Sequence, residues 1–207
     1  MVINFFYIYS MPKKILLILF IICISGFAKA QTADKVYEQY ADFSEATLKH
    51  NTTKALTIGE GIIPNVDKLP QKTRIAFFNG LAKMYENSQQ PNKAIYYYEI
   101  VEVAQPDYYV AHRALGYLYL ITVSDLYKKV TASTTNKAEK DKRITAYRNA
   151  MLKALPQLEK AQACDPSDDT LKIIKMLYTR LDDKQGLSSL NSRLTDLSKN
   201  CIDILTY

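Results

Sequence analysis

The 207-residue chain has no tryptophan and few of the residues that most often build active sites, with three cysteines, two histidines and six glycines. Protein zinc sites draw mainly on cysteine and histidine, so their scarcity argues against a metal-dependent enzyme. The H-E-x-x-H, G-x-S-x-G and C-x-x-C motifs are absent from the sequence, as is a glycine-rich phosphate loop. We therefore expect no catalysis, no metal and no cofactor, and an unrecognised hydrolase is the enzymatic alternative.

The first 30 residues have the three parts of a secretory signal. Lys13 and Lys14 form a basic start, residues 15–27 are mostly apolar, and residues 28–30 give a small-x-small cleavage pattern. The apolar run is too short for a helix that crosses a membrane, which needs about 20 residues. We predict a signal peptide over residues 1–30, with Met11 as an alternative start, and export of the remaining chain across the inner membrane to the periplasm.

The balance of charge gives little reason to expect a nucleic-acid or membrane partner. The full chain has 27 basic and 21 acidic residues, and the signal holds three lysines and no acidic residue, so its removal lowers the formal net charge from +6 to +3. Two cysteines remain, Cys164 and Cys201. Their spacing leaves open whether they form a disulfide or stay as two buried thiols.

A repeated pattern occupies the middle of the chain. The segment FFNGLAKMY matches AHRALGYLY at an offset of 34 residues, and the stretch around Lys93 matches that around Lys153 at an offset of 60. A fixed period of this size is typical of arrays of helical hairpins. His112 stands at a packing position of the pattern, so we expect it to be packed and not catalytic. The other positions expected to pack or to end a unit are Phe78, Leu81, Ala82, Tyr85, Ala94, Tyr98, Pro106, Leu115, Gly116, Tyr119, Ala154, Leu158, Ala161 and Pro166.

The first unit reads aromatic-x-x-Leu-small-x-x-Tyr, then Ala-x-x-x-aromatic, then proline, and in this it resembles a tetratricopeptide repeat (TPR) protein of the exported bacterial type. The resemblance implies an all-α, right-handed solenoid of helical hairpins, with about eight helices in one domain over residues 31–207. Clear repeat units are expected at residues 75–106 and 109–166, and degenerate hairpins at residues 32–64 and 168–203.

The second unit carries an insertion. The change of offset from 34 to 60 places 26 extra residues inside it, at roughly 120–145. Apolar residues at helical spacing continue on both sides of the polar stretch TASTTN, which predicts an over-long hairpin with its tip near Thr131 to Asn136. Pro156 lies in the returning arm and is expected to kink the helix or to mark a restart.

The resemblance also implies where a partner binds. Proteins of this family commonly bind extended peptides or partner domains in a concave groove formed by the first helices of the hairpins. We expect Lys83 and Arg113 to hold a peptide carboxylate. Asn79 and Tyr117 are expected to donate hydrogen bonds to the peptide backbone, and Asn87 shares their face. The alternative is a solvated polar face.

A second predicted binding surface is the tip of the inserted hairpin, where basic residues cluster, among them Lys129, Lys140 and Arg143. Such a tip can dock an acidic partner or lipid headgroups, or it can stay solvated. The sequence thus predicts an exported, non-catalytic adaptor for a protein or peptide partner. An accessory subunit of an envelope assembly that handles glycans or secreted substrates is the alternative. The identity of the partner and the oligomeric state stay open.

Overall fold

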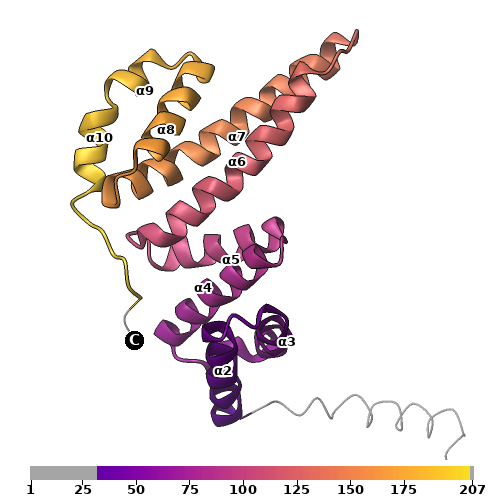
Figure 1. Ribbon diagram of the computed structural model, residues 1–207, viewed down its shortest axis with the longest axis vertical. Helices are drawn as coiled ribbons and strands as arrows, with labels where there is room; N and C mark the ends of the chain where they lie inside the picture. Colours follow the sequence, from indigo (N-terminus) through magenta and orange to yellow (C-terminus); the bar gives the residue numbers. More distant parts are fainter. Residues whose placement is uncertain (1–31, 206–207) are drawn as a thin grey trace, which may run out of the picture.

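A computed structural model describes residues 32–205, and in this range the chain forms nine α-helices and one 3-10 helix and no β-strand (Figure 1). The prediction of an all-α chain is confirmed. The predicted signal peptide lies outside the described residues. None of the described helices is long and apolar enough to cross a membrane.

The helices follow one another with short connections. They are α2 (Ala33–Leu48), α3 (Thr52–Ile62), the 3-10 helix η2 (Ile63–Lys68), α4 (Gln71–Asn87), α5 (Pro91–Ala104), α6 (Tyr109–Thr131), α7 (Lys137–Cys164), α8 (Asp168–Leu181), α9 (Lys184–Ser188) and α10 (Leu190–Leu197).

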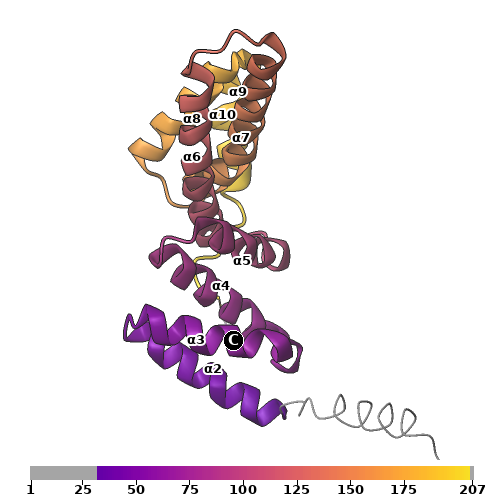
Figure 2. The same ribbon diagram turned by 90° about the vertical axis from the view of Figure 1, so that its right-hand side faces the viewer.

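Consecutive helices pack in pairs, and each pair leans on the next. Helix α2 packs on α3, α4 on α5 and α6 on α7, while α3 also contacts α4, α5 contacts α6 and α7 contacts α8. Figures 1 and 2 show the pairs following one another along the long axis of the molecule. A pair of amphipathic helices buries one face within the pair and needs a neighbour to cover the rest, which accounts for the single continuous core.

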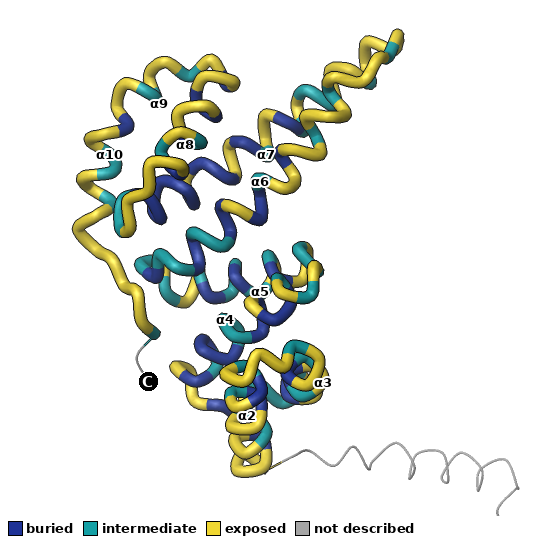
Figure 3. Tube along the Cα trace, in the orientation of Figure 1, coloured by how far each residue is buried: buried dark blue, intermediate teal, exposed yellow. Residues whose placement is uncertain are grey.

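The repeated positions supply this core. Leu81, Tyr85, Leu115 and Leu158 are almost completely buried, and the small residues of the pattern are buried too. Figure 3 shows the buried, dark blue segments spread along α4 to α8. Phe78 is an exception, because it is only half-buried and stacks on Tyr97 with 5.7 Å between ring centroids. The remaining buried positions of the pattern are Ala82, Ala94, Tyr98, Gly116, Tyr119, Ala154 and Ala161. The exposed prolines, Pro106 and Pro166, each follow a helix end.

Helices α6 and α7 approach most closely at Gly116. A Cβ atom on this residue would lie 2.7 Å from Cδ2 of Leu158 and 3.3 Å from the Leu158 backbone nitrogen. Since Leu158 has no exposed surface, it has little room to move away. The small residue predicted at this position is therefore required by the helix crossing.

The over-long hairpin has its tip where it was predicted. Helix α6 ends at Thr131 and α7 begins at Lys137, with Oδ1 of Asn136 accepting a hydrogen bond from the backbone N–H of Glu139. Of the two alternatives expected at Pro156, a kink or a restart of the helix, the restart is not found, since α7 runs through this residue. The carbonyl that loses its donor is that of Leu152, which belongs to an exposed residue on the solvent side of α7.

The last hairpin departs from the prediction of about eight helices, because its second arm is divided into α9 and α10. The division falls at Ser189, where φ is −90° and ψ is 0°. The Ser189 hydroxyl donates to the carbonyl of Gln185 at 2.8 Å, in addition to the Ser189 N–H at 3.1 Å. The Arg193 guanidinium donates to the carbonyl of Gly186 at 2.9 Å, which is the acceptor that the N–H of Leu190 would use in a continuous helix.

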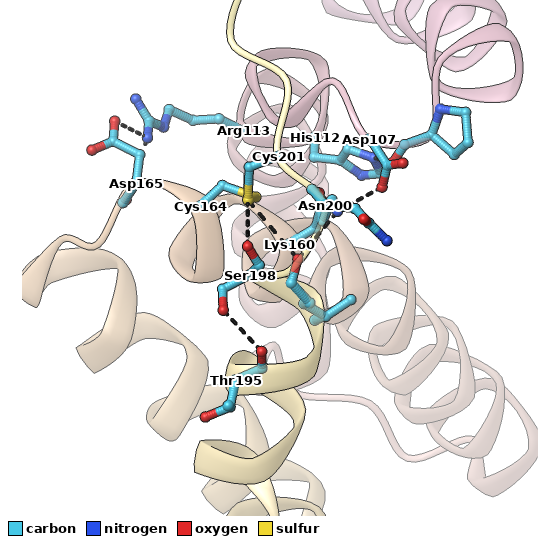
Figure 4. The surroundings of a disulfide bond; sticks show 12 residues. Asp107, His112, Arg113, Lys160, Cys164, Asp165, Thr195, Ser198, Asn200 and Cys201 are labelled. Carbon is cyan, nitrogen blue, oxygen red and sulfur yellow. Dashed lines mark hydrogen bonds and ion pairs between the residues drawn. A yellow bond between two sulfur atoms is a disulfide. The ribbon is translucent and has the colours of Figure 1, made fainter.

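Of the two alternatives for the cysteines, the structure has the disulfide. Cys164 at the end of α7 is bonded to Cys201, and their Cα atoms are 5.6 Å apart (Figure 4). Next to this bond, the Lys160 side chain is buried and its Nζ donates to Oδ1 of Asp107 at 2.9 Å and to the carbonyl of Asn200. These contacts hold the end of the chain against the joint between α5 and α6.

The crossing at Gly116 can be tested by adding a single methyl group. Gly116→Ala should lower the free energy of unfolding by about 1–3 kcal/mol, because the new Cβ overpacks against Leu158. Gly61→Ala is the matched control, since its Cβ meets nothing within 4 Å and only the gain in helix propensity, up to about 1 kcal/mol, remains. Urea unfolding followed by circular dichroism measures both. Equal stability of the two variants would contradict the close approach.

Candidate functional site

Three neighbouring hollows lie over α2, α4 and α6, which are the first helices of their hairpins. The central hollow has a volume of about 440 Å³. It shares Asn79 with a hollow between α2 and α4, and it shares Glu86 and Tyr117 with a hollow further along α6. We call the three together the groove. The residues that line the central hollow are Asn79, Lys83, Glu86, Tyr98, Val110, Arg113, Ala114 and Tyr117.

Four of the five predicted groove residues come together in the central hollow. Asn79 and Lys83 reach it from α4, and Arg113 and Tyr117 reach it from α6. Asn87, the last residue of α4, does not line it.

Both cations of the central hollow already have carboxylate partners. Nζ of Lys83 lies 3.2 Å from Oε2 of Glu86, and the guanidinium of Arg113 pairs with Asp165, which follows α7. More than a third of both cationic side chains is exposed, so each ion pair contributes at most about 1 kcal/mol and is open to exchange. A ligand carboxylate would therefore have to displace Glu86 or Asp165.

One polar atom of the groove lacks a partner. Oδ1 of Asn79 is buried and accepts no hydrogen bond within residues 32–205, while Nδ2 makes a long contact of 3.4 Å to the hydroxyl of Tyr108. Buried acceptors without a donor are rare and costly. Asn79 was expected to donate a hydrogen bond to a ligand, but the atom of Asn79 that lacks a partner is Oδ1, which can only accept one. The Tyr117 hydroxyl, also an expected donor, lies 2.9 Å from the Thr170 hydroxyl of α8.

Tyr98 was predicted only as a packing residue, yet it also takes part in the groove. Its ring is buried, and its hydroxyl donates to Oε2 of Glu86 at 3.0 Å. Burial raises the pKa of the Tyr98 phenol well above its usual range, and the nearby Glu86 carboxylate adds to the rise. Tyr98 thus stays neutral and fixes Glu86 beside Lys83. A buried tyrosine generally needs a partner for its hydroxyl, which is the signal that the sequence offered.

Helix α2 contributes a wall that sequence reasoning missed. The hollow between α2 and α4 is lined by Tyr40, Phe43 and Leu48 from one side and by Asn79 and Gly80 from the other. The Phe43 ring sits against Gly80, where a Cβ would lie 3.0 Å from Cε1 of the ring. A glycine in the middle of a helix was the only sequence signal for this contact.

The groove continues along α6 toward the hairpin tip. Tyr117 and Ile121, one helical turn apart, are 40% and 50% exposed, and Ile121 lines the outer hollow together with Pro91 of α5. Asp125 and Lys128 follow on the same face and are exposed. An exposed stripe therefore links the groove to the tip.

The basic residues at the tip differ in what they do. Arg143 is half-buried, donates to Oε1 of Glu139 at 2.9 Å and reaches across the hairpin to the carbonyl of Lys129 at 3.0 Å, so it holds the two arms together. The side chains without an ion pair in the described part of the tip are those of Lys129, Lys137, Lys140 and Lys142, and all four are exposed.

Nothing in the described chain gathers the usual groups of a metal site, since residues 32–205 contain no cluster of three or more histidine, cysteine, aspartate or glutamate side chains. His112 is packed, as predicted. It is 7% exposed, with Nδ1 lying 2.6 Å from Oε1 of Gln157 and Nε2 lying 2.8 Å from the carbonyl of Pro106.

No protein-family model matches the chain, and searches of curated proteins and of solved structures give no match.

The contribution of the Tyr98–Glu86 hydrogen bond to stability can be measured by removing the Tyr98 hydroxyl. Tyr98→Phe should lower the free energy of unfolding by about 1 kcal/mol, because a buried donor is lost while the carboxylate stays. Tyr96→Phe is the control, since Tyr96 is 60% exposed and no hydrogen bond of its hydroxyl is found in the described chain. Thermal unfolding compares the two. Equal melting temperatures would mean that the Tyr98 hydroxyl does not stabilise the fold.

Proposed function

We propose that this protein is an exported, non-catalytic adaptor of the TPR type that binds an extended segment of a partner protein in the groove and an acidic part of the same partner at the hairpin tip. The observation that carries the proposal is the continuity of the three hollows across α2, α4 and α6, because neighbouring hollows share lining residues.

The chemistry of the groove favours a peptide. Exposed apolar surface at Tyr117 and Ile121 alternates with exchangeable ion pairs, and Asn79 offers a buried acceptor. An extended peptide carries a backbone N–H at every residue except proline, so it brings a donor for Asn79 and side chains for the apolar hollows.

The hairpin extends the surface that one partner can touch. Thr131 stands fourteen positions after Tyr117 on α6, which corresponds to about 21 Å along a helix. An extended segment needs roughly seven residues to cover this length. We therefore expect a partner that presents at least this much accessible chain or a folded surface of similar extent.

The proposed location and the proposed architecture rest on the sequence. The signal-like residues 1–30 support export to the periplasm, and the aromatic-x-x-Leu-small-x-x-Tyr pattern supports a right-handed solenoid of TPR hairpins. Contacts that run from each helix pair to its neighbour are consistent with that arrangement.

The partner can be obtained by crosslinking. The chain from Gln31 onward, carrying an affinity tag, is incubated with the envelope fraction of the source cells, and the crosslinked protein is identified by mass spectrometry. The affinity of the purified partner is then measured by calorimetry for the intact chain and for the variants below.

Asn79→Ala should weaken partner binding by about tenfold or more, because the backbone donor bonded to Oδ1 would be left without an acceptor. The stability of the free chain should change by less than about 1 kcal/mol, since the hydrogen bond found for the Asn79 side chain among residues 32–205 is a long one. Asn87→Ala, on the same helix but outside the groove, should leave the affinity unchanged. Equal affinities of the two variants would exclude a role for Asn79.

Replacing the four unpaired lysines of the tip by glutamine, at Lys129, Lys137, Lys140 and Lys142, should weaken binding by roughly tenfold at low salt and abolish most of the salt dependence. The hairpin should remain folded, because Arg143 still joins its arms. Removal of residues 129–143 with a short linker tests the shape of the tip in addition to its charge. If neither change alters the affinity, the tip takes no part in binding.

A further inference from the structure

The described chain ends in an extended segment, residues 200–205, that crosses the joint between α5 and α6 and runs toward the start of α4 (Figures 1 and 2). Ile202 pairs with the backbone on both sides of Tyr108. Its N–H donates to the carbonyl of Asp107 at 2.8 Å, and its carbonyl accepts from the N–H of Tyr109 at 3.1 Å. This is the way in which an extended peptide docks on a free backbone edge.

The apolar side chains of the segment cover the start of α4 without filling the space. Ile202, Ile204 and Leu205 enclose a cavity of about 160 Å³ together with Lys72 and Ile75 of α4 and with Gln105. Ile202 is 37% exposed and Ile204 is 66% exposed. Lys160 Nζ holds the Asn200 carbonyl at the start of the segment, but beyond Cys201 the hydrogen bonds found in the described chain are the two at Ile202, and the other contacts of residues 202–205 are loose and aliphatic. This is a weak attachment for a folded element.

A covalent bond compensates for the weak attachment. Cys201 precedes Ile202 directly and is joined to Cys164 at the end of α7. Because Ile202 follows Cys201 directly, the disulfide keeps Ile202 close to its docking surface, at a high effective concentration. Cys201 is exposed, so a thiolate of another molecule can reach this disulfide.

We propose that residues 200–205 form a displaceable strap over a second peptide site, made by the start of α4 and the α5–α6 joint, and that reduction of the Cys164–Cys201 disulfide opens this site to an extended aliphatic segment of another protein. The inference rests on the contacts of the strap and goes beyond the groove and tip described above.

The opening reaction is a thiol–disulfide exchange with a dithiol. One thiolate of the dithiol attacks Sγ of Cys201 and forms a mixed disulfide, while Sγ of Cys164 leaves as a thiolate and takes up a proton. The second thiol of the dithiol then attacks the mixed disulfide, which frees Cys201 as a thiol and leaves the dithiol oxidised. Both electrons come from the dithiol, and the chain gains two protons.

The strap site adjoins the groove. Ile75 and Asn79 lie one turn apart on α4, and the Tyr108 hydroxyl accepts the contact from Asn79 while the backbone around Tyr108 binds Ile202. Opening the strap therefore changes the surroundings of Tyr108, whose hydroxyl contacts the groove residue Asn79.

Hydrogen exchange in the full chain tests whether the disulfide holds the strap in place. After reduction with dithiothreitol, the Ile202 amide should exchange at least tenfold faster, because its bond to Asp107 opens more often. The amides of Leu115 and Ala154 in the buried core serve as internal controls. Unchanged exchange at Ile202 would show that the disulfide does not hold the strap and would overturn the proposal.

Peptide binding tests the site. The probe is a labelled peptide of residues 199–207 carrying Cys201→Ser, and its binding is followed by fluorescence anisotropy. An oxidised chain with Ile202→Asp and Ile204→Asp should bind the probe at least tenfold more tightly than the oxidised wild-type chain, because its own strap no longer fits. Both residues are exposed, so the variant should remain folded. Reduction should raise binding to the wild-type chain.

A probe that itself carries Ile202→Asp and Ile204→Asp is the specificity control and should not bind. If the variant and the oxidised wild-type chain bind the unaltered probe equally, or if neither binds it, the displaceable strap is excluded. No envelope partner is present in this assay, so its failure leaves the groove proposal untouched.

Discussion

The crossing of α6 and α7 at Gly116 and Leu158 is the constraint on which the remaining packing depends. Helix α5 packs on α6, and the three helices α2, α3 and α4 are linked to α6 through α5, while α8 and α10 both pack on α7. Arg113 and Tyr117 stand on α6, within one turn of Gly116. A wider crossing would move one wall of the central hollow away from α4. The close packing of Gly116 against Leu158, two residues that do not line the groove, thus sets the width of the groove.

Two neighbouring charges on α7 fix what lies on either side of it. Glu159 and Lys160 are both about 5–6% exposed, and a buried charge without a partner is strongly destabilising. Glu159 receives two hydrogen bonds from Arg193 of α10, at 2.8 and 3.0 Å, and the hydroxyl of Tyr178 of α8. Lys160 binds Asp107 and the backbone at the end of the chain. Glu159 therefore holds α10 in place beside α7, and Lys160 holds the residues that follow α10 beside Asp107.

Much of the fold was predictable because the repeat pattern and helical periodicity act locally. The hairpin tip between Thr131 and Lys137 and the small residue at Gly116 follow from spacing alone. The division of the last arm at Ser189 was missed, because the spacing of the leucines does not reveal that the Arg193 side chain binds the Gly186 carbonyl at the break. The disulfide was undecided for a similar reason, since the distance between two Cα atoms separated by 37 residues depends on the packing of three helices.

The candidate site was predictable in position but not in chemistry. Helical geometry placed Asn79, Lys83, Arg113 and Tyr117 on one surface, where they line the same hollow. The partner of Arg113 is 52 residues away at Asp165, and the hydroxyl that contacts Tyr117 belongs to α8. Such pairings depend on tertiary contacts that no local pattern encodes.

The disulfide gives the last part of the chain an unusual topology. Residues 164 to 201 form a covalent ring that contains α8, α9 and α10, and the turn from Asp182 to Asp183 between α8 and α9 lies within that ring. A protease that cuts once at this turn opens the ring but leaves both fragments attached to the same molecule. Under oxidising conditions a single cut there therefore releases no fragment, and the buried contacts of α10 with α7 are kept close enough to form again.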